Sequence, residues 1–108
     1  MPSQLHIPEL KDIIELTEDW TFTLHEERRN SAMWDLMNPT NKMKGRYYIP
    51  NPQSMEVTLA AGTQLVVDRI YIRAGASSFN SVTFRAKIDR KSIRFWAKLK
   101  DVNRIVMV

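Results

Sequence analysis

The sequence predicts a mainly β fold, a small curled barrel of about five to seven short antiparallel strands with one short N-terminal helix. Apolar and polar residues alternate along Leu65–Arg73, Ser81–Ile88 and Ile93–Leu99, and side chains two apart share one face of a strand. A tight connection, Asp89–Ser92, separates the last two stretches. The 108 residues are enough for one domain with its own core.

Two further strands are predicted near the N-terminus, after an extended lead-in at Ile7–Leu10 that Pro8 favours. The first is Asp12–Thr17. In the second, Trp20–His25, apolar residues occupy every second position, which is typical of a half-buried strand.

A short helix is predicted over Ala32–Met37, with Asn30 or Ser31 as its N-cap and Asn38-Pro39 as its stop. Its apolar stripe favours packing against the core, with a groove for a partner as the alternative. The stripe consists of Met33, Trp34, Leu36 and Met37.

A long loop, Asn38–Ser54, follows the helix, and loops of this length inside a compact domain are usually functional or mobile. Within it Lys42, Lys44 and Arg46 precede Tyr47-Tyr48. This segment is either a second basic and aromatic contact or a strand.

The C-terminal half begins with a strand, Met55–Leu59, and a turn in which Gly62 takes a positive φ. Alternation slips once within Leu65–Arg73, and a β-bulge near Asp68-Arg69 would return Leu65, Val67, Ile70 and Ile72 to one face. The remaining elements are a loop at Ala74–Asn80, a one-turn break at Asp101–Asn103 and a final strand at Arg104–Val108.

Two segments, Leu59–Thr63 and Arg94–Asn103, give residues 55–108 a resemblance to the Src-homology-3-type barrel. The resemblance implies a barrel core over 55–108 with an embellishment over 1–54, in a single domain spanning 1–108. Such barrels bind polyproline peptides, nucleic acids or peptidoglycan, so the fold does not choose a function. The compact, cysteine-free and motif-poor chain also resembles small proteins of tailed phages.

Composition argues against several classes of function. There is no cysteine, and His6 and His25 have no metal-ligand spacing. No phosphate-binding loop or nucleophile elbow is present, so we expect neither an enzyme nor a cofactor. No signal peptide or membrane span is visible, and we expect a cytoplasmic location, in the host cytoplasm if a phage encodes the chain.

Charge divides the chain into unlike halves. Residues 1–64 carry a net charge of −3, and residues 65–108 carry +7. Alternation would place the cations of the later strands on one face with two aromatic residues, which suits single-stranded nucleic acid or RNA. The predicted site consists of Arg69, Tyr71, Arg73, Arg85, Lys87, Arg94, Trp96 and Lys98. Internal pairing with acids such as Glu26 and Glu27 would instead neutralise this face.

Two other functions stay open. In the first, the chain binds a host protein, for example a defence or transcription factor, and inhibits or redirects it. The residues for that surface are Met33, Trp34, Met37, Tyr47 and Tyr48. In the second, a small anionic nucleotide is captured between protomers. The C-terminal strand, if it lies at a sheet edge, would allow a homo-oligomer.

Overall fold

The structure is a computed structural model that describes residues 10–43, 49, 51–72 and 80–105. It confirms a mainly β fold, with six antiparallel strands in the described ranges. The elements in chain order are β1 (Ile13–Glu15), β2 (Trp20–His25), the 3-10 turn η1 (Arg28–Asn30), α1 (Ser31–Met37), β3 (Ser54–Leu59), β4 (Gln64–Tyr71), β5 (Ser81–Ile88), β6 (Lys91–Lys98) and α2 (Leu99–Val102).

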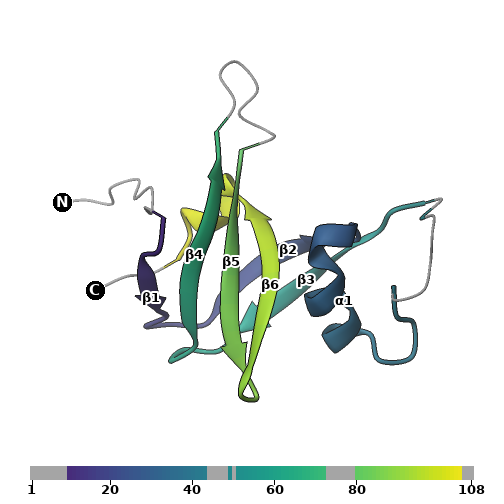
Figure 1. The fold of residues 1–108 in the computed structure, drawn as a ribbon, viewed down its shortest axis with the longest axis horizontal. Coiled ribbons are helices and arrows are strands. Elements are labelled where there is room, and N and C mark those ends of the chain that lie inside the picture. Colours follow the sequence, from purple (N-terminus) through teal and green to yellow (C-terminus); the bar gives the residue numbers. More distant parts are fainter. Residues whose placement is uncertain (1–9, 44–48, 50, 73–79, 106–108) are drawn as a thin grey trace.

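The strands form two separate sheets and not the predicted curled barrel. Four strands pair in the order β1-β4-β5-β6, and β2 pairs only with β3. The two-stranded sheet of β2 and β3 crosses behind the larger sheet in Figure 1. The sheets meet at a corner, where Leu16 accepts a hydrogen bond from Gly62 N at 2.6 Å and donates one to Thr63 O at 3.0 Å. At this corner the chain passes from β1 to β2 and from β3 back to β4. Strands β2 and β3 therefore pair with each other, and no described strand joins the two sheets into a closed barrel.

The core lies between the two sheets and is mainly aromatic. Phe22 of β2 stacks on Phe95 of β6 with ring centroids 4.9 Å apart, and Trp20 meets the Phe84 ring edge to face at 5.8 Å. Such pairs add roughly 0.5–1.5 kcal/mol each beyond the area they bury. The buried Trp20 indole also donates to Asp101 O at 2.8 Å, which fixes α2 against β2.

The bulge predicted in β4 is confirmed, but it does not bury every apolar residue beyond it. Val67 pairs with Phe84 and Arg69 pairs with Thr83, so Asp68 is the extra residue. Ile70 packs against the core. Ile72, in contrast, is 52% exposed, because β4 ends at Tyr71 and no longer directs it inward.

Helix α1 forms where predicted, yet Asn30 does not cap it with its side chain. The Asn30 amide instead donates to His25 O at 3.0 Å, and its oxygen accepts from Trp96 N at 2.7 Å. This fully buried side chain therefore joins η1 to β2 and to the edge of β6. Met33 and Trp34 are buried in the core, which confirms the packing interpretation of these two residues of the stripe.

The turns form near the predicted positions, but Lys91 and Ser92 belong to β6 and not to the predicted connection. Gly62 has the predicted positive φ, 91°, and the two-residue turn between β5 and β6 places Asp89 and Arg90 at φ 50° and 67°. The one-turn break is α2, which begins at Leu99 and not at Asp101. Arg104 and Ile105 are not in a strand. The predicted lead-in before Leu10, most of the loop after Ala74, Lys44–Tyr48 and Val106–Val108 lie outside the described residues. No helix in the described ranges is long and apolar enough to cross a bilayer.

Candidate nucleic-acid interface

The side of the four-stranded sheet turned away from β2 and β3, which we call the outer face, carries the predicted cations. In the hydrogen-bonded register Arg85 pairs with Val66 and with Arg94, and these three side chains point to the same side. The next row along the strands is Arg69, Thr83 and Trp96, and the following one is Tyr71, Ser81 and Lys98. Lys87 lies opposite Ser92. Of the predicted site, Arg73 alone lies outside the described residues.

Asp68, the bulge residue, provides the counter-charge for two of these cations. Its carboxylate lies 3.4 Å from Arg85 Nε and 3.5 Å from Arg94 Nε. Arg85 and Arg94 are direct cross-strand neighbours, and like charges in that position repel. One carboxylate between them therefore reduces a repulsion that the sheet register creates.

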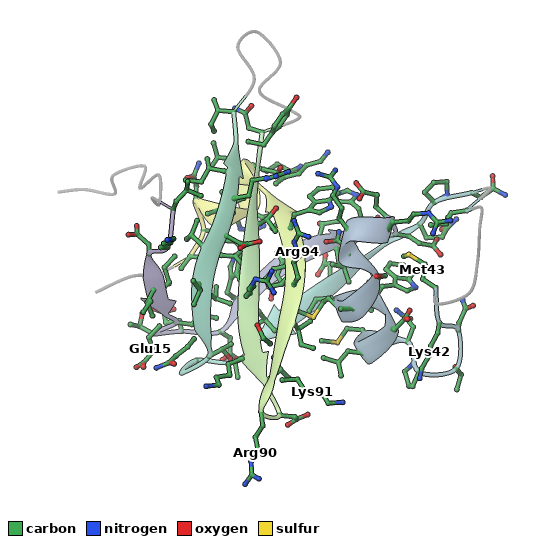
Figure 2. The ribbon with its side chains drawn as sticks, viewed as in Figure 1. Glu15, Lys42, Met43, Arg90, Lys91 and Arg94 are labelled. Atoms are coloured by element: carbon green, nitrogen blue, oxygen red, sulfur yellow. The ribbon has the colours of Figure 1, made fainter. Side chains whose placement is uncertain are left out.

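The other described cations of the outer face are not paired in this way. Arg69, Lys87 and Lys98 form no ion pair with a carboxylate in the described part of the chain. Arg69 and Lys87 are exposed, and Lys98 is half-buried. Figure 2 shows Arg94 beside β6, on the face turned toward the viewer. The expected internal pairing with Glu27 is not formed here, because Glu27 binds Arg29 of η1 instead.

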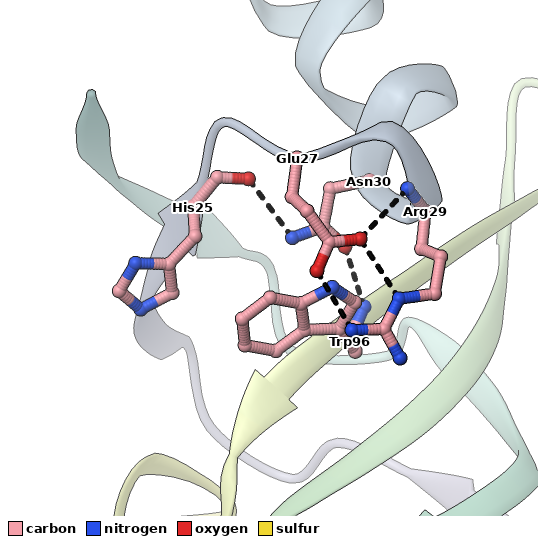
Figure 3. Close-up of polar contacts among 5 residues, drawn as sticks. All are labelled: His25, Glu27, Arg29, Asn30 and Trp96. Carbon is pink, nitrogen blue, oxygen red and sulfur yellow. Dashed lines mark hydrogen bonds and ion pairs between the residues drawn. The ribbon is translucent and has the colours of Figure 1, made fainter. Parts of the chain in front are cut away.

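Trp96 is half-buried at the border between the outer face and η1 (Figure 3). The His25 ring stacks on it with centroids 5.2 Å apart and planes 8° from parallel. The Arg29 guanidinium carbon lies 5.6 Å from the indole centroid, a cation–π distance. The indole thus has two partners within the chain, and only part of its surface faces solvent.

Two charged residues beside Trp96, Arg29 and Glu27, form a bidentate ion pair. Arg29 donates to Glu27 through Nε at 2.8 Å and through Nη2 at 2.7 Å. These hydrogen bonds lower the pKa of Glu27 and raise the pKa of Arg29. Burial, followed by the nearby charge of Lys98, lowers the pKa of His25, which favours the neutral form of its ring.

A shallow hollow of about 320 Å³ lies on the outer face, toward the β1 edge. Its apolar part comes from Ile13, which is 72% exposed, and from Val66, its cross-strand neighbour. Arg85 and Lys87 supply its charge, and Gln64 and Ser92 complete the lining. Sequence reasoning missed this hollow because it depends on the pairing of β1 with β4, for which the three-residue β1 carries no signal.

Of the alternative protein-binding residues, the three that the structure describes do not form an accessible surface. Met33 and Trp34 are buried, and Met37 is partly buried against the core. Tyr47 and Tyr48 lie outside the described residues. The largest exposed apolar side chain that α1 offers is Leu36, at 40%.

Comparison with protein family models, with curated proteins and with solved structures finds no match for the chain. The resemblance to Src-homology-3-type barrels therefore stays a sequence-based expectation. Among the described residues, no group of three or more histidine, aspartate or glutamate side chains is placed to hold a metal ion.

Proposed function

We propose that this protein is a non-enzymatic module that binds single-stranded nucleic acid or RNA on its outer face. One observation carries the proposal: the register collects Arg69, Arg85, Lys87, Arg94 and Lys98 on one sheet face, where Asp68 is the acid that pairs with cations. Clustered cations repel each other and cost stability. A polyanion offsets that cost and gains from counterion release.

The side chains suggest how a strand would lie. Arg85, Lys87, Arg94 and Lys98 contact phosphates, because they are the cations that the adjacent strands β5 and β6 carry on the outer face. Tyr71, which is 47% exposed, offers an open ring on which a base can stack. Trp96 contributes the part of its indole that His25 and Arg29 leave free.

The aromatic pair favours a single strand over a duplex. Tyr71 and Trp96 lie on β4 and β6, and these two strands are about 10 Å apart with β5 between them. The residues between them on β5 are the small Ser81 and Thr83. A flat face of this kind accommodates splayed bases, whereas the paired bases of a duplex expose only their edges.

Titration of a fluorescently labelled oligouridylate, followed by anisotropy at several salt concentrations, tests the proposal. Arg94→Ala and Lys98→Ala should each weaken binding and reduce the slope of log K against log salt by about 0.7. Lys91→Ala is the matched control, because Lys91 is exposed and lies on the same side of β6 as the buried Ile93, the side turned away from the outer face. Absence of binding at low salt, or equal slopes for all three variants, would overturn the proposal.

The alternative of a host-protein ligand has less support, because Met33 and Trp34 pack into the core. Affinity capture from lysate with and without nuclease distinguishes the two functions. A partner that survives nuclease treatment at fixed stoichiometry would favour the protein ligand.

A further inference from the structure

The hollow beside β1 combines two surfaces that a simple phosphate-binding patch does not need. Ile13 and Val66 form an apolar floor, although both side chains are exposed to water. Arg85 and Lys87 stand on the adjoining strand, and Lys87 has no carboxylate partner in the described ranges. The complementary ligand therefore has an anionic end and an apolar body.

The remaining lining residues narrow the apolar body to a base. Gln64 carries an amide that both donates and accepts hydrogen bonds, and Ser92 carries a hydroxyl that does the same. These groups match the polar edge of a nucleobase, whose faces are apolar enough to lie on aliphatic side chains. A purely aliphatic ligand would cover these groups and exclude water from them without offering hydrogen bonds in return, which is costly.

The volume of the hollow limits the size of the ligand, and the charges around it determine the ligand's orientation. A volume of about 320 Å³ is at the low end for small-molecule sites, so one nucleotide is accommodated and not a longer stretch. Glu15 lies at the rim, with its carboxylate 3.5 Å from the Gln64 amide. Its charge repels phosphate from that end, so the phosphate lies toward Arg85 and Lys87.

We propose that the hollow is a nucleotide subsite, in which one base lies over Ile13 and Val66 while its phosphate contacts Arg85 and Lys87. This inference rests on the proposed function, because it assigns one unit of the bound strand to a particular place. It adds a base-binding position at the β1 end of the outer face, at the opposite end from Tyr71.

The subsite is tested by titrating the full chain with adenosine 5′-monophosphate and, separately, with ribose 5-phosphate. Binding of each probe is measured by NMR. The two probes have the same phosphate and sugar, and only the first has a base. We expect the nucleotide to bind about tenfold more tightly, the equivalent of covering about 60 Å² of apolar surface. Ile13→Ser should remove this preference and leave ribose 5-phosphate unaffected, whereas Arg85→Ala should weaken both probes.

Ile72→Ser is the control, because Ile72 is also an exposed isoleucine but does not line the hollow. Equal affinity for the two probes, or equal effects of Ile13→Ser and Ile72→Ser, would overturn the subsite. If the subsite fails in this way but an oligonucleotide still binds with its normal salt slope, the proposed function stands without the subsite. If the mononucleotide binds in the hollow and the oligonucleotide does not bind, the proposed function fails, and with it the assignment of the hollow to one unit of a bound strand.

Discussion

Replacement of Asp68 by asparagine should strengthen nucleic-acid binding while it weakens the fold. Asp68 lies 3.4 Å from Arg85 and 3.5 Å from Arg94, so it occupies the place that a phosphate would take. A strand that binds these arginines must displace its carboxylate. The neutral amide removes that competition and leaves two cations free to bind phosphate.

The structure sets the size of both effects. The three side chains are 31–48% exposed, and ion pairs at this exposure contribute about 0–1 kcal/mol each. We therefore expect the free energy of unfolding to fall by about 1 kcal/mol. Arg85 and Arg94 already contact phosphate in the unaltered protein, so the number of contacts and the salt slope should stay nearly the same. Loss of the competing carboxylate should raise affinity at low salt by about tenfold.

Anisotropy titrations at several salt concentrations, with urea unfolding in parallel, measure the two effects. Asp89→Asn is the matched control, because Asp89 is an exposed acid on the β5–β6 turn and forms no ion pair with an outer-face cation in the described part of the chain. It changes the net charge equally and should alter affinity less than threefold. An Asp68→Asn variant that binds no more tightly than Asp89→Asn would refute the reasoning.

Three further outcomes are expected. Asn30→Ala should lower the free energy of unfolding by about 2–4 kcal/mol in urea, because it leaves Trp96 N and His25 O without partners; a loss below 1 kcal/mol would contradict this. Arg90→Gly should raise stability by about 1 kcal/mol, since the residue has a φ of 67° that glycine adopts without strain. The pKa of Glu27 is lowered in the fold, so its stabilising effect is present above its ordinary pKa and is lost as pH falls through the lower folded value. Glu27→Gln should therefore flatten the acid side of the stability–pH profile, and an unchanged profile would contradict that.

Local patterns determined most of the fold. Alternation predicted the first and last residues of β2 and β5 correctly. Each strand buries one face, and a period of two residues determines which side chains lie on that face. The slip in β4 identified the bulge at Asp68, since no regular strand could bury Val67 and Ile70 together. Alternation does not predict which strand pairs with which. The pairing of β1 with β4 and of β2 with β3 therefore had to come from the structure, and with it the absence of a closed barrel among the described strands.

The candidate site divides in the same way. Which cations share the outer face follows from alternation, and the register adds that Arg85 and Arg94 are direct neighbours. The partners of Trp96 do not follow from the sequence. His25 ends β2 and Arg29 belongs to η1, and only the packing of η1 against β6, held by Asn30, brings both to the indole.

The most direct test of the central claim is an NMR titration of the full chain with an oligouridylate, in which backbone amide shifts are mapped residue by residue. The account predicts the largest shift changes at the amides of β4, β5 and β6 around Arg69, Arg85 and Arg94, with little change in α1. Changes centred on α1, or no change at low salt, would contradict it.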